Sequence, residues 1–210
     1  HGAFDLLSRI YGYLAGACQH LARLDDSDGW ARRIVTMGRE RGDAAMEASG
    51  YETQAENGTA RGLWRNAIAH AETELVLASR VHAEDRKAWA NLPRGWGLHG
   101  LGELAAAETV LRENLELCRR IGEPRLATFV QALLGQVCLD LGADEEANTL
   151  LSEAARESER MNLSYVRALV CQYRGYRACE RADWDEALAE YARARQIREG
   201  SDARLNEMYF

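Results

Sequence analysis

Residues that build β-sheets or break helices are scarce in this chain of 210 residues. It has 2 prolines, and valine and isoleucine together number 13, against 34 alanines and 26 leucines. β-branched residues favour strands, whereas alanine and leucine favour helices. The composition therefore argues against a sheet-based fold and predicts an all-α protein.

Clustered positive charge is also missing. The formal net charge is -7, Lys87 is the single lysine, and no block of basic residues occurs. A protein that binds a nucleic-acid duplex neutralises phosphates with lysine and arginine side chains. We therefore expect no direct nucleic-acid partner.

Long apolar runs and paired cysteine motifs are absent as well. No run reaches the roughly 18 apolar residues of a membrane-spanning helix, and no signal peptide is evident. The 5 cysteines are odd in number and form no CxxC pair, which indicates free thiols in a reducing compartment. We therefore expect a cytoplasmic protein without membrane contact. The chain begins with His1, and we interpret it as a segment of a longer protein.

What the sequence does contain is an internal repeat with a period of 40 residues. Three sets of positions keep their character from one period to the next, which is typical of repeat architectures. The positions of the first set hold alanine, and those of the second set hold small residues. The positions of the third set hold residues that tolerate the left-handed conformation that ends helices. The sets are Ala67, Ala107, Ala147 and Ala187; Ala15, Ala55, Gly95, Gly135 and Gly175; and Gly42, His82, Gly122, Asn162 and Asp202.

Each period divides into two stretches with the apolar spacing of amphipathic helices. The first helices are predicted over 6–22, 46–60, 86–101, 126–141 and 165–181. The second helices are predicted over 27–41, 64–81, 104–121, 144–161 and 184–199. Asp183 with Glu186 three residues later indicates a capping box at the last of these. Because a helix pair cannot bury its apolar face alone, neighbouring pairs are expected to stack.

The pattern resembles the tetratricopeptide repeat. The match is clearest in the last two units, and the resemblance extends over about residues 6–200. The residues that carry it are Leu134, Gly135, Cys138, Ala147, Leu151 and Ala154, then Gly175, Ala178, Ala187, Tyr191 and Ala194. It implies a right-handed superhelical solenoid of about five antiparallel helix pairs.

Two departures from the family pattern stand out. The period is 40 residues instead of the usual ~34, and the proline that normally ends the second helix is absent. Longer units of this kind resemble those of large bacterial signalling ATPases and transcription activators. HEAT and armadillo repeats share the ~40-residue period and are the alternative, but their proline-bent helices are not evident.

The repeat predicts one domain over residues 1–210 with five units at 6–43, 44–83, 84–123, 124–163 and 164–202. Residues 203–210 fit the start of a further helix. Terminal repeats normally carry a polar capping face, and both ends here look uncapped. We therefore expect end-to-end pairing of two copies through these ends.

Motifs that would indicate an enzyme or a cofactor site are weak or missing. The stretch Gly95–Gly100 matches G-x-G-x-x-G, but a dinucleotide site needs a preceding strand, and a helix is predicted here. His70 and Glu74 lie four residues apart on one helix face, without a third metal ligand. We expect no catalytic activity, no cofactor and no metal.

In the resembled family, ligands lie in a concave groove lined by the first helix of each pair. Carrying the contact positions over predicts a binding face with aromatic, amide and carboxylate side chains. Aromatic rings supply contact area, and amides satisfy the backbone groups of a peptide. Two carboxylates make one end acidic, which favours a basic partner segment, whereas packing between units is the alternative role of Trp96 and Phe129. The candidate residues are Glu52, Glu56, Trp89, Trp96, His99, Phe129, Gln136, Gln172 and Tyr176.

The favoured hypothesis is a helical-repeat scaffold that binds a protein or peptide segment. It would act as the regulatory or recruitment segment of a larger bacterial signalling or transcription regulator. The alternative is a repeat domain of a transcription activator that senses a small-molecule effector, and a deep closed pocket around the third unit would favour it.

Overall fold

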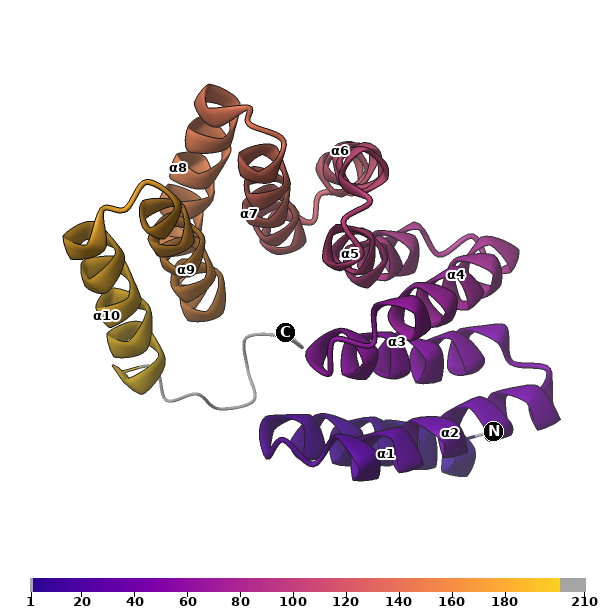
Figure 1. Ribbon diagram of the computed structural model, residues 1–210. Coiled ribbons are helices and arrows are strands. Elements are labelled where there is room, and N and C mark those ends of the chain that lie inside the picture. The colour runs from indigo at the N-terminus through magenta and orange to yellow at the C-terminus, as the bar shows by residue number, and fades with distance from the viewer. Residues whose placement is uncertain (1, 201–210) are drawn as a thin grey trace. The chain divides into compact units, whose positions relative to one another are not determined.

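The computed structural model describes residues 2–200, and this part of the chain consists of ten α-helices without a strand (Figure 1). Each helix begins within three residues of a predicted one, except α1, which begins earlier. The all-α class and the succession of antiparallel helix pairs are confirmed. The helices are α1 (Gly2–His20), α2 (Leu24–Arg41), α3 (Ala44–Ala60), α4 (Trp64–Arg80), α5 (Glu84–Gly100), α6 (Leu104–Ile121), α7 (Pro124–Asp140), α8 (Asp144–Arg160), α9 (Ser164–Glu180) and α10 (Trp184–Gly200).

The turns between helices repeat every twenty residues. Each contains one residue with positive φ, and glycine, which has no Cβ, adopts this conformation most easily. The prediction is confirmed for Gly42, His82, Gly122 and Asn162, while Asp202 lies outside the described residues. The turns inside each unit use the same conformation, at Ala22, Gly62, Gly102, Gly142 and Ala182.

Side-chain caps begin two of the helices. The carboxylate of Asp43 accepts a hydrogen bond from the backbone N–H of Met46 at 3.0 Å. The carboxylate of Asp183 accepts one from the N–H of Glu186 at 3.1 Å, as the capping motif predicts. These caps stabilise the helix starts after left-handed turns.

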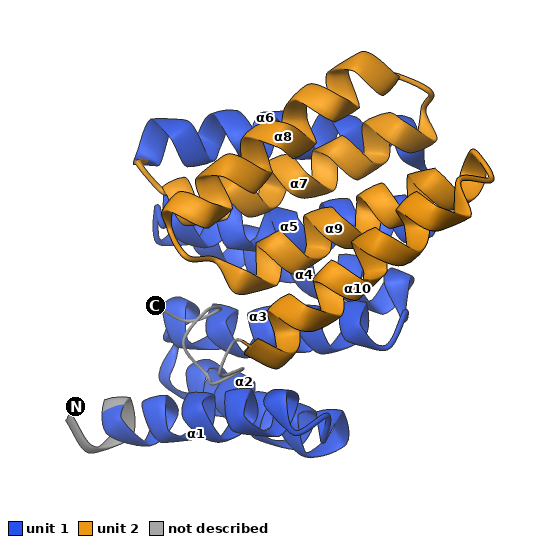
Figure 2. Ribbon diagram, turned by 90° about the vertical axis from the view of Figure 1, so that its left-hand side faces the viewer, with its two compact units in different colours: residues 1–121 blue, residues 122–210 orange. Residues whose placement is uncertain are grey.

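The chain divides into two compact units, His1–Ile121 and Gly122–Phe210 (Figure 2). In unit 1, each helix from α1 to α6 packs against the next, and α3 also contacts α1 and α5. In unit 2, α7 to α10 pack in the same way, and α7 also contacts α9. Each unit is thus a stack of antiparallel helix pairs. The single repeat domain expected over the whole chain stays a prediction.

The small residues of the repeat let the two helices of a pair approach closely. Ala67, Ala107 and Ala147 are fully buried. A Cβ placed on Gly135 would lie 2.8 Å from Cγ of Leu151, which is too close for a carbon–carbon contact. The repeated glycine therefore makes room for the large side chain of the second helix, and this is how the cores reach close packing.

Among the described helices, none combines the length and the hydrophobicity that a bilayer crossing requires.

Candidate functional site: the A-helix face

The predicted site residues lie on the first helix of each pair. In each unit separately, we call the surface that these helices form the A-helix face of that unit. It consists of α1, α3 and α5 in unit 1 and of α7 and α9 in unit 2. In unit 1 the predicted residues are Glu52 and Glu56 on α3 and Trp89, Trp96 and His99 on α5, all half-buried. In unit 2 they are Phe129 and Gln136 on α7 and Gln172 and Tyr176 on α9. The two groups are described separately.

The two predicted carboxylates of α3 connect it to both neighbouring first helices. Oε2 of Glu52 lies 3.2 Å from Nη1 of Arg86 on α5, and the Glu52 side chain is 27% exposed. Oε2 of Glu56 accepts a hydrogen bond from Nε2 of Gln19 on α1 at 3.1 Å. Both carboxylates thus lie at the surface of unit 1 while their positions are held by neighbours.

A partly buried polar network continues from Gln19 towards α2. Nε2 of Gln19 also donates to Oδ1 of Asn57 at 2.9 Å, and Nδ2 of Asn57 donates to Asp28 at 2.6 Å and to Ser27 at 3.0 Å. Nη1 of Arg61 completes the network at 2.6 Å from Oδ2 of Asp28. Ser27 stands at the repeat position that is alanine in the other units, and its hydroxyl accounts for this departure.

Behind the α3 carboxylates lies a third carboxyl group. Glu74 of α4 is fully buried, and neither of its oxygens has a hydrogen-bond partner among the described residues. Burial raises its pKa to about 10, the charges of Glu52 and Glu56 add to this shift, and Arg86 opposes it. Burial likewise raises the pKa of Glu52, again against the effect of Arg86. Glu74 is therefore protonated at neutral pH, and Arg86 lies near both Glu52 and Glu74.

His70, four residues before Glu74, makes an aromatic contact. The ring of His70 packs against Tyr51, with centroids 5.8 Å apart, and burial lowers the pKa of this histidine. Within residues 2–200, no cluster of three His, Cys, Asp or Glu side chains has the arrangement of a metal site.

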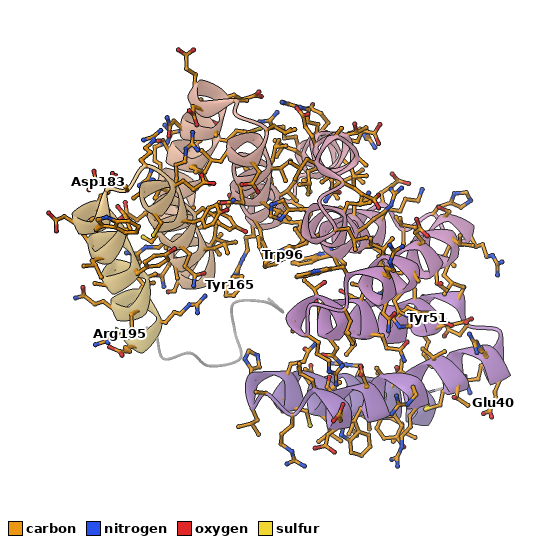
Figure 3. All side chains as sticks on the ribbon, viewed as in Figure 1. Glu40, Tyr51, Trp96, Tyr165, Asp183 and Arg195 are labelled. Carbon is orange, nitrogen blue, oxygen red and sulfur yellow. The ribbon has the colours of Figure 1, made fainter. Side chains whose placement is uncertain are left out.

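The glycine-rich stretch 95–100 lies inside α5, where its glycines serve helix packing. A Cβ on Gly95 would lie 2.5 Å from Leu111 of α6, and one on Gly97 would lie 2.7 Å from Ile68 of α4. The stretch follows no strand, so it lacks the setting of a dinucleotide site. Trp96 and His99, between these glycines, belong to the A-helix face, and Figure 3 labels Trp96.

In unit 2 the predicted residues differ in accessibility. Tyr176 is 45% exposed, and Gln136 is buried at 4% exposure and donates a hydrogen bond to Asp140 at 3.0 Å. The ring of Phe129 packs edge-on against Tyr165 of α9, with centroids 5.4 Å apart. This contact agrees with the alternative of packing between repeat units for Phe129. Oε1 of Gln172 accepts a hydrogen bond from Arg198 at 3.0 Å.

Sequence reasoning did not connect Glu74, Arg86 and Asn57 with this face. The sequence did contain one signal for Glu74. It stands at the repeat position of Ile34, Asn114 and Ala154, and these three residues are buried. A carboxyl group at a position that is buried in each of these repeats indicates a special role or a strained core.

A surface hollow of about 490 Å³ lies elsewhere, between α1 and α2. The guanidinium of Arg33, which lines it, stacks 4.6 Å above the ring of Trp30. None of the predicted site residues lines this hollow. Its lining residues are Tyr11, Gly29, Arg32, Arg33, Thr36 and Met37.

Comparison with known proteins identifies the fold. No family model and no curated protein matches the chain. Among solved structures, a Rap protein in complex with competence and sporulation factor is similar, with a TM-score of 0.78 and 16% identity over 91% of this chain. Aspartyl phosphate phosphatase F from Bacillus subtilis has a TM-score of 0.72 and 12% identity over 94%. The apo form of RapI has a TM-score of 0.71 and 14% identity over 93%.

The chain spans 54%, 61% and 72% of the length of these three proteins. At these identities the likeness concerns the fold. It agrees with the helix pairs described above and places the chain among tetratricopeptide-like helical-repeat structures.

Proposed function

We propose that this protein is a non-enzymatic scaffold that binds a protein or peptide segment, and that the A-helix face of unit 1 receives a basic part of it. The supporting observation is the set of carboxylates on α3. Glu52 and Glu56 are partly exposed on this face, Arg86 pairs with Glu52, and the protonated Glu74 lies behind them. An arginine or lysine of a partner would form charge-assisted hydrogen bonds with the carboxylates of this face.

The net charge of -7 supports the same partner class. Electrostatic attraction between an acidic protein and a basic segment raises the rate of association, and salt screens it. The half-buried Trp96 and His99 on the adjacent α5 would add contact area beside the carboxylates.

The similar structures support partner binding by this fold, because one of them is a Rap protein complexed with competence and sporulation factor. We further infer a cytoplasmic regulatory or recruitment segment of a larger bacterial signalling or transcription regulator. The long repeats support this role, because they resemble those of bacterial signalling ATPases and transcription activators. Another of the similar structures is named a phosphatase, and we do not extend that activity to this chain.

The test uses short fluorescent peptides with a central arginine, compared by fluorescence anisotropy with the same peptides carrying glutamate. We expect the arginine peptides to bind more tightly and binding to weaken as salt is added. Glu56→Gln removes one partly exposed charge and should weaken binding roughly 3- to 10-fold. Trp96→Ala should weaken it as well.

The matched control is Glu113→Gln, which removes the same charge from an exposed position on α6. It should leave binding unchanged. Equal binding of arginine and glutamate peptides, or an equal loss in Glu56→Gln and Glu113→Gln, would refute the proposed face.

A further inference from the structure

The hollow between α1 and α2 carries two adjacent positive charges. Arg32 and Arg33 of α2 both line it, and both are exposed. Its volume of about 490 Å³ falls within the range of small-molecule sites, which is roughly 300–1,000 Å³. We call it the α2 hollow, and it is lined by Tyr11, Gly29, Arg32, Arg33, Thr36 and Met37.

The charges of the two arginines are not compensated within the protein. Neither guanidinium forms an ion pair with a carboxylate that the structure describes. Asp28 stands one turn before Arg32, but its Oδ1 accepts a hydrogen bond from Asn57 at 2.6 Å and its Oδ2 lies 2.6 Å from Arg61. In a chain with a net charge of -7, this uncompensated pair favours a ligand of negative charge.

The exposure of the two arginines is a property of the second helices in general. Glu72 of α4 and Arg112 of α6 stand at the repeat position of Arg32, and their side chains are 57% and 43% exposed. Each of these helices follows a complete helix pair. The accessibility of Arg32 therefore does not depend on what precedes α1.

The pair of positive charges is specific to α2. The equivalent positions of the later second helices hold at most one cation, and Arg112 forms an ion pair with Glu108 at 2.7 Å. These positions are occupied by Glu72 with Thr73, Arg112 with Glu113, Ser152 with Glu153, and Ala192 with Arg193.

Aromatic rings hold one of the two guanidiniums in place. Cζ of Arg33 lies 4.6 Å from the ring centroid of Trp30 and 5.8 Å from that of Tyr11, and the two rings are 5.2 Å apart. A guanidinium stacked by its flat face keeps the N–H groups at its edge for an anion. Gly29 adds space beside it, because nothing lies within 4 Å of a Cβ built there.

We propose that the α2 hollow binds a phosphate group carried on an aromatic ring. Two adjacent guanidiniums match the nearly double negative charge of a phosphate monoester and bind its oxygens in bidentate fashion. Tyr11 supplies a flat apolar surface for the ring of the ligand. The site takes the opposite charge to the A-helix face of unit 1 and shares none of its predicted residues, so neither proposal depends on the other.

The test is isothermal titration calorimetry of the 210-residue chain with phenyl phosphate, inorganic phosphate and phenol. Phenyl phosphate should bind more tightly than either of the other two. Arg32→Gln and Arg33→Gln should each weaken its binding roughly 10-fold. Circular dichroism should show unchanged helix content, because both positions are exposed. The matched control is Arg112→Gln, which removes the same charge from the equivalent position of α6 and should bind as the unaltered protein does.

A further variant separates the contribution of the ring from that of the charge. Tyr11→Leu should weaken the binding of phenyl phosphate and leave that of inorganic phosphate unchanged. A short uncharged peptide with a phosphotyrosine identifies the source of the ligand: tighter binding than phenyl phosphate supports a protein side chain, and equal or weaker binding supports a small molecule.

Three results would overturn the proposal. The first is no binding of phenyl phosphate, or binding no tighter than that of phenol. The second is unchanged affinity in Arg33→Gln. The third is an equal loss of affinity in Arg112→Gln, which would show that the effect comes from net charge and not from the α2 hollow.

Discussion

At the scale of single residues, the carboxyl group of Glu74 is the most unusual feature of unit 1. It is fully buried without a hydrogen-bond partner among the described residues, at a repeat position where Ile34 and Ala154 are apolar. A buried polar group without a partner destabilises a fold. Two residues of the A-helix face act on it by their charges: Glu52 raises the pKa of Glu74 further, and Arg86 lowers it.

This carboxyl group should make stability fall as pH rises. Its pKa is about 10 in the folded protein, against an ordinary value of 4.5 when unfolded. Between these values the folded state holds a proton that the unfolded state has lost, so the free energy of unfolding decreases with pH. From about pH 5 to about pH 8 we expect a loss on the order of 3 kcal/mol from this group. Urea unfolding measures it.

Glu74→Gln cannot ionise and should therefore show a smaller decrease over the same pH range and greater stability at pH 8. The control is Glu72→Gln on the same helix, whose carboxylate is 57% exposed and should retain the dependence of the unaltered protein. Parallel pH profiles for Glu74→Gln and the unaltered protein would show that Glu74 is ionised in the folded state.

At the scale of elements, the glycines inside helices have two different roles. In α2, nothing lies within 4 Å of a Cβ built on Gly29, whereas a Cβ on Gly38 would lie 2.5 Å from the backbone nitrogen of Glu47 on α3. Backbone atoms cannot move aside as a flexible side chain does. Gly38 therefore permits the close approach of α2 and α3, whereas Gly29 has no part in this contact.

We expect opposite effects from alanine at these two positions. Gly29→Ala should raise the free energy of unfolding by up to about 1 kcal/mol, because alanine favours the helix. Gly38→Ala should lower it by about 1–3 kcal/mol through overpacking, in spite of the same helical preference. Thermal and urea unfolding of both variants measure the difference. Stabilisation by Gly38→Ala would mean that α2 and α3 are less tightly packed than described.

At the scale of the whole molecule, each of the two units has its own core of apolar and polar buried side chains. Unit 2 is built around α7, where Val130, Leu133 and Val137 are fully buried. In unit 1, buried alanines such as Ala67 and Ala71 lie beside the polar groups Asn57 and Glu74. Unit 2 also buries polar side chains, Gln131 and Glu190 among them, so each core combines apolar and polar groups.

A large side chain of the α7 core should matter far more than an exposed one. Leu133→Ala should cost about 2–5 kcal/mol, because it leaves a cavity in a fully buried site. Hydrogen exchange should locate the lost protection in α7 and its contact helices α8 and α9. Leu188→Ala, at a 69% exposed position, should change stability by less than about 0.5 kcal/mol. Similar losses of stability in Leu133→Ala and Leu188→Ala would contradict the assignment of the core.

The sequence by itself determined the helices, their pairing and the left-handed turns, because these depend on local preference and on periodic spacing. Gly42, Gly122 and Asn162 follow the period without reference to distant residues. Ala22 and Ala182 adopt the same left-handed conformation and were not predicted, since alanine has no preference for it. At these two turns the geometry of the repeat imposes the left-handed conformation in spite of the preference of alanine.

Only the tertiary structure decided which groups meet at the candidate site. Glu52, Glu74 and Arg86 come from three different helices, and their distances depend on how α3, α4 and α5 stack. The same stacking buries Gln136 and leaves Tyr176 exposed, although the family pattern marks both as contact residues. A period records where a residue stands in its repeat, whereas burial and pKa depend on the side chains that neighbouring helices bring to that place.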